Sequence, residues 1–141
     1  MTKKPTDTKI IVLGGWGEVG KNMYCVMHND QIIIIDAGIL FPEDDLLGID
    51  YVLPDFTFLK QNQDKIKALI ITHGHEDHIG AIPFLLQSVE IPKIYAPNQA
   101  KELIALKLED RNIRYDNLFV YDEDTVLKFG DITVEFIRTT H

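Results

Sequence analysis

The chain has 141 residues, of which 45% are hydrophobic and 26% charged. This composition is typical of one small globular domain and excludes a largely disordered or fibrous protein. The net charge of −8 disfavours non-specific binding of nucleic acid, so an RNA or DNA substrate would need metal ions or basic surface from elsewhere. The chain has no apolar run of the ~20 residues that span a membrane, and its N-terminus has no secretory signal. Its single cysteine, Cys25, excludes an intrachain disulfide and is expected to be buried. We therefore expect a cytoplasmic protein without a membrane partner.

The first half of the chain is predicted to form mostly strands. Residues 1–8 are expected to be disordered, and residues 9–141 to form the domain. In chain order we predict strands over 9–13, 22–28 and 31–36, a long loop over 38–55, a short helix over 56–64 and a strand over 68–71. Asn29-Asp30 between two apolar runs indicates a β-hairpin turn.

The second half alternates helices and strands. In chain order we predict a helix after Thr72 that ends near Ser88, a strand over 94–96, a helix over 98–112 and strands over 118–121, 125–129 and 132–137. Pro83 is compatible with the first helix only if it lies in the first turn. In the second helix Asn98 is the expected N-cap, and the apolar stripe is expected to contain Leu103, Ile104 and Leu108. The order of elements predicts an α/β fold with a mixed or antiparallel sheet.

The glycines at positions 15, 17 and 20 match the G-x-G-x-x-G pattern of dinucleotide-binding proteins. That site needs a helix directly after the glycines, within a βαβ unit of about 30 residues. Residues 22–28 favour a strand and are followed by a turn, so the helix does not fit and we reject a nucleotide site. Two interpretations of Gly15, Gly17 and Gly20 remain: a turn between strands, or a loop whose backbone can approach a substrate closely.

The strongest chemical signal is the sequence His73-Gly74-His75-Glu76-Asp77-His78. It follows a predicted strand, at the carboxyl end where α/β sheets place their sites, and four metal-ligand side chains within six positions exclude an ordinary histidine-rich turn. His73 and His75 alternate around Gly74, so both imidazoles can reach one ion, for which His141 is the candidate third ligand. Asp77 and His78 begin the next helix and would start a second site. Imidazole and carboxylate ligands with an open position favour zinc.

Asp36 ends a strand of isoleucines, where a buried carboxylate needs hydrogen-bond partners. We expect it to accept hydrogen bonds from the segment at residues 72–78, here called the histidine loop, and to orient the metal ligands. The alternative is an acid that only caps a turn at the end of the strand.

Three segments resemble the first three motifs of the metallo-β-lactamase superfamily: Asp36-Ala37-Gly38, residues 72–78 and Thr139-Thr140-His141. The stretches 13–22 and 41–55 further resemble the ribonuclease J family of β-CASP ribonucleases, and the resemblance covers residues 9–141. It implies the N-terminal part, about half, of an αββα sandwich with mixed or antiparallel sheets.

The resemblance also implies an activity: a zinc-dependent ribonuclease, with 5′-to-3′ exonuclease and endonuclease activity, that acts in RNA decay and rRNA maturation. It implies two zinc ions, with manganese or magnesium as alternatives, RNA as substrate and a homo-oligomeric full-length protein. One ion would be held by His73, His75 and His141, and the other by the catalytic pair Asp77 and His78. The family completes its sites with a later aspartate and histidine that have no counterpart here.

The mechanism expected from such a site is hydrolysis of a phosphodiester. Zinc lowers the pKa of water to about 7, which makes hydroxide available for in-line attack on phosphorus. Because the ligand set is incomplete and ends on His141, we expect this chain to be an inactive fragment of the enzyme. The alternatives are another hydrolase of the superfamily, of the thioesterase or lactamase type, and a non-catalytic module that binds a metal or a partner.

Overall fold

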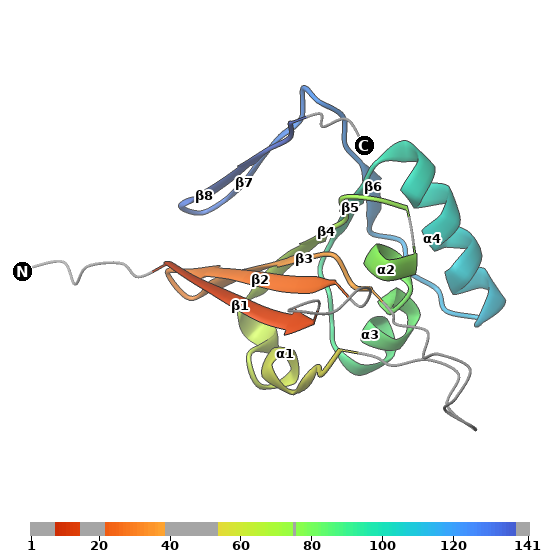
Figure 1. Cartoon of the computed structure of the whole chain (residues 1–141), viewed down its shortest axis with the longest axis horizontal. Coiled ribbons are helices and arrows are strands. Elements are labelled where there is room, and N and C mark those ends of the chain that lie inside the picture. Colours follow the sequence, from red (N-terminus) through yellow and green to blue (C-terminus); the bar gives the residue numbers. More distant parts are fainter. Residues whose placement is uncertain (1–7, 15–21, 39–53, 75, 138–141) are drawn as a thin grey trace, which may run out of the picture.

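The computed structural model of the chain describes residues 8–14, 22–38, 54–74 and 76–137 (Figure 1). The strands in this part are β1 (Thr8–Gly14), β2 (Met23–His28), β3 (Gln31–Ile35), β4 (Ile66–Ile70), β5 (Ile94–Ala96), β6 (Leu118–Val120), β7 (Val126–Phe129) and β8 (Ile132–Glu135). The helices are α1 (Thr57–Gln61), the 3₁₀ turn η1 (Gln63–Lys65), α2 (Glu76–Ile79), α3 (Ile82–Ser88) and α4 (Asn98–Asp110). Within these ranges no helix is long and apolar enough to cross a membrane.

Strands β1 to β6 form one mixed sheet in sequence order, as far as the described residues show. The pairs β1–β2 and β2–β3 are antiparallel, whereas β3, β4, β5 and β6 run parallel to one another. Strands β7 and β8 form a separate antiparallel pair. The predicted α/β class with a mixed sheet is therefore confirmed. The parallel arrangement also brings the carboxyl ends of four strands to one edge.

The hairpin of β2 and β3 forms at the predicted turn. Asn29 and Asp30 have φ angles of 51° and 60°, the left-handed conformation that a two-residue type I′ turn requires at both positions. Strand β2 lies where a dinucleotide-binding fold would need a helix, so the rejection of that fold is confirmed. Cys25 in β2 is buried, as predicted, and burial raises the pKa of its thiol to about 12.

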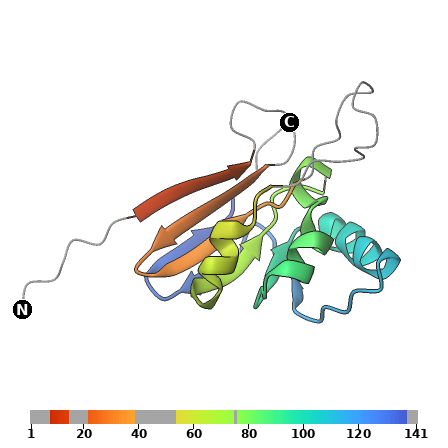
Figure 2. The same ribbon diagram turned by 90° about the horizontal axis from the view of Figure 1, so that it is seen from below.

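The sheet is covered on both faces. Helices α1 and α3 lie on one face and the β7–β8 hairpin lies over the other, as the two orthogonal views show (Figures 1 and 2). In β3, Ile32, Ile33 and Ile34 are successive residues and all are buried, as expected of a central strand with both faces covered. On the helical face, Leu59 of α1 and Leu85 of α3 belong to the same core cluster as Ile32 and Ile34.

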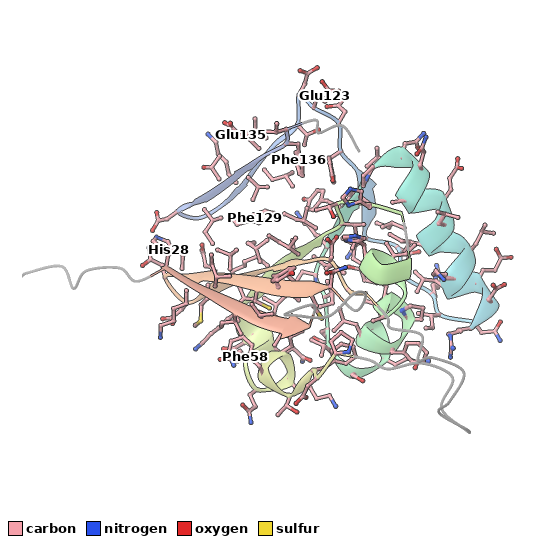
Figure 3. The ribbon with its side chains drawn as sticks, viewed as in Figure 1. His28, Phe58, Glu123, Phe129, Glu135 and Phe136 are labelled. Atoms are coloured by element: carbon pink, nitrogen blue, oxygen red, sulfur yellow. The ribbon has the colours of Figure 1, made fainter. Side chains whose placement is uncertain are left out.

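The β7–β8 hairpin alternates between half-buried and exposed side chains. Phe129 lies between the hairpin and the sheet (Figure 3), with its ring centroid 6.2 Å from that of Tyr95 in β5. At the turns of the two hairpins, the Asn29 amide donates a hydrogen bond to the Asp131 carboxylate. These contacts fix the hairpin against the sheet.

The helix predicted after Thr72 is two helices. Pro83 lies in the first turn of α3, as its position required. It has no N–H to donate to the carbonyl of Ile79, so the helical hydrogen bonds cannot continue from α2 into α3. The N–H of Ala81 instead donates to the carbonyl of Ala37, at 2.8 Å.

Helix α4 also differs in detail from the prediction. Its N-cap is Pro97, and Asn98 is the first helical residue. Its buried side chains are Ala100, Ile104 and Leu108, which share one face because they are four residues apart. Leu103 belongs to the neighbouring stripe and is 44% exposed, so its assignment to the core stripe was wrong.

Several other boundaries differ from the predictions. Strand β1 begins at Thr8, a residue expected in the disordered N-terminus, and residues 1–7 lie outside the described part. The helix predicted over 56–64 ends at Gln61 and is followed by η1. Most of the long loop predicted over 38–55 lies outside the described residues.

Candidate metal centre

The carboxyl ends of the four parallel strands place the candidate site residues at one edge of the sheet. Asp36 follows β3, the histidine loop follows β4, Pro97 follows β5 and Tyr121 follows β6. A cleft of about 570 Å³ opens here, with Thr72, His73, His78 and Gln99 among its lining residues. Ligands of open α/β sheets bind at such an edge.

Asp36 is the central acceptor of the site. It is 3% exposed and has a φ of 62°, a left-handed conformation that Asp adopts more readily than most residues. Its Oδ1 accepts the Thr72 N–H at 2.7 Å, and its Oδ2 accepts the Thr72 hydroxyl at 2.6 Å and lies 2.7 Å from Nδ1 of His78. These bonds offset the desolvation of the buried carboxylate and hold the start of the histidine loop.

The same network assigns the tautomers of two histidines. The Thr72 hydroxyl donates its hydrogen to Asp36, so at 2.9 Å it accepts a hydrogen from Nδ1 of His73. His78 in turn donates its Nδ1 hydrogen to Asp36, since the carboxylate can only accept. In their neutral forms both rings therefore have the Nε2 lone pair that a metal ion requires. The rings adjoin, with centroids 4.6 Å apart and planes tilted by 43°.

Backbone contacts fix the loop from two other sides. The N–H of Ala37 donates to the carbonyl of His78, at 2.7 Å, which ties the segment after β3 to α2. Against α4 the loop packs so closely that a Cβ on Gly74 would lie 3.1 Å from Cδ1 of Leu103 and 3.4 Å from Cα of Ala100. A glycine between His73 and His75 therefore suits this packing.

Tyr121 is a site residue that the sequence did not indicate. Its hydroxyl donates to the carbonyl of Ile71 at 2.5 Å, and its ring stacks on Phe136 with centroids 3.6 Å apart. Burial and the nearby charge of Asp36 raise the pKa of Tyr121 to about 12. In the sequence it is only an aromatic residue at the end of a predicted strand, so no local signal distinguishes it.

The remaining predicted site residues lie outside the described part of the chain. They are the ligands His75, Asp77 (its side chain) and His141, and the candidate substrate-loop glycines Gly15, Gly17 and Gly20. The backbone of Asp77 lies in α2 beside His78. Among the side chains that are described, no three or more His, Cys, Asp or Glu residues form a group that could hold a metal ion.

Comparison with known proteins places this chain in a family. Residues 16–141 match the family model described as the metallo-beta-lactamase superfamily. Ribonuclease J 1 of Streptococcus pyogenes is 52% identical over 139 residues, which are 98% of this chain and 25% of that protein. Ribonuclease J of Mycoplasma pneumoniae is 50% identical over 137 residues, 96% of this chain and 24% of that protein. The chain thus spans about a quarter of the length of these curated relatives.

A solved structure supports the fold. The metallo-beta-lactamase fold protein YhfI from Bacillus subtilis superposes with a TM-score of 0.56 at 20% identity, over 96% of this chain and 54% of that one. The predicted resemblance to ribonuclease J is confirmed by the curated relatives. From the matched model, the fold and these relatives we conclude that the chain belongs to the metallo-β-lactamase superfamily.

Proposed function

We propose that this chain is the metal-binding part of a two-metal ribonuclease that hydrolyses RNA phosphodiester bonds, as a 5′-to-3′ exonuclease and as an endonuclease. The single observation that supports this most directly is the network of Asp36 and Thr72, which prepares His73 and His78 as metal ligands. The relatives named ribonuclease J support RNA as the substrate. We further propose a homo-oligomeric enzyme of RNA decay and rRNA maturation in the cytoplasm.

His73 and His78 suit metal binding by the chemistry of their donors, and the rest of the proposed ligand set lies outside the described residues. Metallo-β-lactamase proteins generally depend on two metal ions. Two adjacent imidazoles with oxygen partners on Nδ1 are typical of zinc sites, in which a carboxylate or hydroxyl orients each histidine. We propose zinc as the ion, with manganese or magnesium as alternatives.

Each residue has a distinct task in the proposed reaction. His73, His75 and His141 would hold one ion, and Asp77 and His78 the other. The bound ions would supply an activated water and neutralise charge on the phosphate. Asp77 would accept a hydrogen bond from the attacking water, and Asp36 would keep Nε2 of His78 aimed at the site.

The net charge of −8 affects how RNA reaches this centre. Because the chain repels a polyanion overall, binding needs the cations at the site and basic surface outside these 141 residues. Gly15, Gly17 and Gly20 would let the backbone approach the RNA closely.

The experiment compares variants of the complete protein on 5′-monophosphorylated RNA, after chelation and return of zinc or manganese. His78→Ala should lower turnover at least about 100-fold, because removal of one metal ligand disturbs the position of the ion relative to the phosphate. His28→Ala is the control: this histidine lies at the β2–β3 turn (Figure 3), with Nδ1 2.7 Å from Oγ1 of Thr8. Thioester or lactam turnover without RNA cleavage would show a different hydrolase, and metal binding without turnover would show a non-catalytic module.

The 141 residues taken alone should not cleave RNA. They contain only Asp77 and His78 for the second proposed ion, and two-metal hydrolysis needs both ions held in a closed set of ligands. The same RNA assay on the isolated segment and the complete protein tests this. Comparable turnover by the segment, lost in His75→Ala, would contradict it.

A further inference from the structure

We infer that Tyr121 is a positioning residue for the histidine loop at residues 72–78. The inference rests on the proposed function, because it assigns Tyr121 a task in holding the ligands of that metal centre. It concerns a side chain from β6, which lies two strands away from β4 in the sheet.

The peptide unit between Ile71 and Thr72 is held by two side chains. Its carbonyl oxygen, on Ile71, accepts the Tyr121 hydroxyl at 2.5 Å. Its N–H, on Thr72, donates to Oδ1 of Asp36 at 2.7 Å. Because both polar groups of one planar unit are engaged from opposite sides, the plane cannot rotate without breaking a bond.

This plane sets the direction in which the chain leaves β4. The preceding N–H, on Ile71, donates to the carbonyl of Tyr95 in an extension of the β4–β5 ladder, at 2.8 Å. Ladder bonds of this kind end at Ile71, and the next residues are Thr72 and His73. The orientation of the Ile71–Thr72 unit, together with the φ and ψ of Thr72, therefore sets where His73 begins.

Tyr121 is itself fixed on several sides. Its N–H donates to the carbonyl of Ala96 at 3.1 Å, and its ring lies almost parallel to that of Phe136, at an angle of 13°. Phe136 directly follows β8, at the end of the hairpin that lies over the sheet (Figure 3). The raised pKa of Tyr121 keeps its phenol protonated at neutral pH, so the Tyr121 hydroxyl remains a donor. A fixed ring with a permanent donor is suited to hold a backbone carbonyl.

The test is Tyr121→Phe in the complete protein, which removes the hydroxyl and retains the ring. Tyr115→Phe is a matched control, because the Tyr115 hydroxyl also donates to a backbone carbonyl, that of Ile91 at 2.6 Å, and is also half-buried. Zinc affinity, measured by competition with a chelator, should fall about 10–100-fold in Tyr121→Phe and remain unchanged in Tyr115→Phe. In the metal-free protein, amide exchange at Thr72 should accelerate only in Tyr121→Phe.

The outcomes separate this inference from the proposed function. Wild-type zinc affinity and Thr72 exchange in Tyr121→Phe would overturn the positioning role, as would equal losses in both variants, which would indicate a general effect on stability. A wild-type protein that binds no metal would contradict the proposed function. In that case the exchange rate at Thr72 still decides whether Tyr121 holds the loop.

Discussion

At the scale of single residues, the site depends on one buried carboxylate. Asp36 accepts two bonds from Thr72 and one from His78, so it connects the end of β3 to the histidine loop. The sequence predicted a strand-end acid that accepts bonds from this loop, because a charge after four isoleucines needs partners. Its metal-orienting role remains a proposal.

Asp36→Asn tests how much of this depends on the charge. Asn tolerates the left-handed φ, but its amide has only one acceptor atom, and its NH₂ group faces donors. We expect a loss of about 1–3 kcal/mol in the free energy of unfolding and a fall of about 10–100-fold in zinc affinity. Urea denaturation and a metal titration measure the two effects.

Asp55→Asn is the matched control for this substitution. Asp55 also accepts both the N–H and the hydroxyl of a threonine, Thr57, at 2.9 and 2.6 Å, but it is exposed at the start of α1. These bonds lower the pKa of Asp55. Its substitution should cost less stability and leave zinc affinity unchanged; equal effects at the two positions would contradict a special role for Asp36.

At the scale of elements, the β7–β8 hairpin is held at its turn. Gly130 has a φ of 60° and lies so close to Gln31 of β3 that a Cβ would be 2.2 Å from its Nε2. Oε1 of Gln31 is buried and, among the described residues, has no hydrogen-bond partner. The predicted turn at Gly130-Asp131 therefore favours glycine for its positive φ, and a Cβ there would require the end of the Gln31 side chain to move.

Gly130→Ala should reduce the free energy of unfolding by about 1–3 kcal/mol, because it adds strain at a positive φ and forces the Gln31 side chain to move. Gln31→Ala removes the clash but not the strain, so the double variant should lose less stability than the two single losses added together. Urea denaturation of the four proteins gives the coupling. Strict additivity would show that Gly130 and Gln31 do not interact.

At the scale of the whole molecule, helices on one face and a hairpin on the other bury groups that ionise only at high pH. The pKa of Cys25 is raised from 9.0 to about 12 and that of Tyr121 from 10.0 to about 12, and burial also raises the pKa of Tyr115. In each case the folded state retains its proton more strongly than the unfolded chain. These groups thus contribute stability that is fully present below the unfolded pKa and is lost as pH rises towards the folded pKa.

The free energy of unfolding should therefore fall above pH 9. Cys25 alone should account for about 1 kcal/mol at pH 10, because one pKa unit corresponds to about 1.4 kcal/mol. Cys25→Ala should show a shallower decline between pH 8 and pH 11, whatever its stability at pH 7. Urea denaturation across this range measures both slopes, and identical slopes would show that the thiol does not contribute.

Local sequence was sufficient for much of the fold. Strand β5 has the predicted bounds, and the turn at Asn29-Asp30 was predictable because these residues tolerate a positive φ. Boundaries were harder to predict: Pro83 interrupts the helix after Thr72, and the N–H of Ala81 donates instead to the carbonyl of Ala37, a residue 44 positions earlier. The identity of such a long-range partner leaves no signal in the local pattern.

The candidate site shows the same division. The sequence by itself determined the candidate ligand types and their spacing, since His73, Asp77 and His78 lie close together in the chain after a buried strand. Only the tertiary structure showed that Asp36 and Tyr121 hold the two ends of one peptide unit before His73. The physical reason is that β3, β4 and β6 meet at one edge through parallel pairing, and that pairing depends on contacts between distant residues.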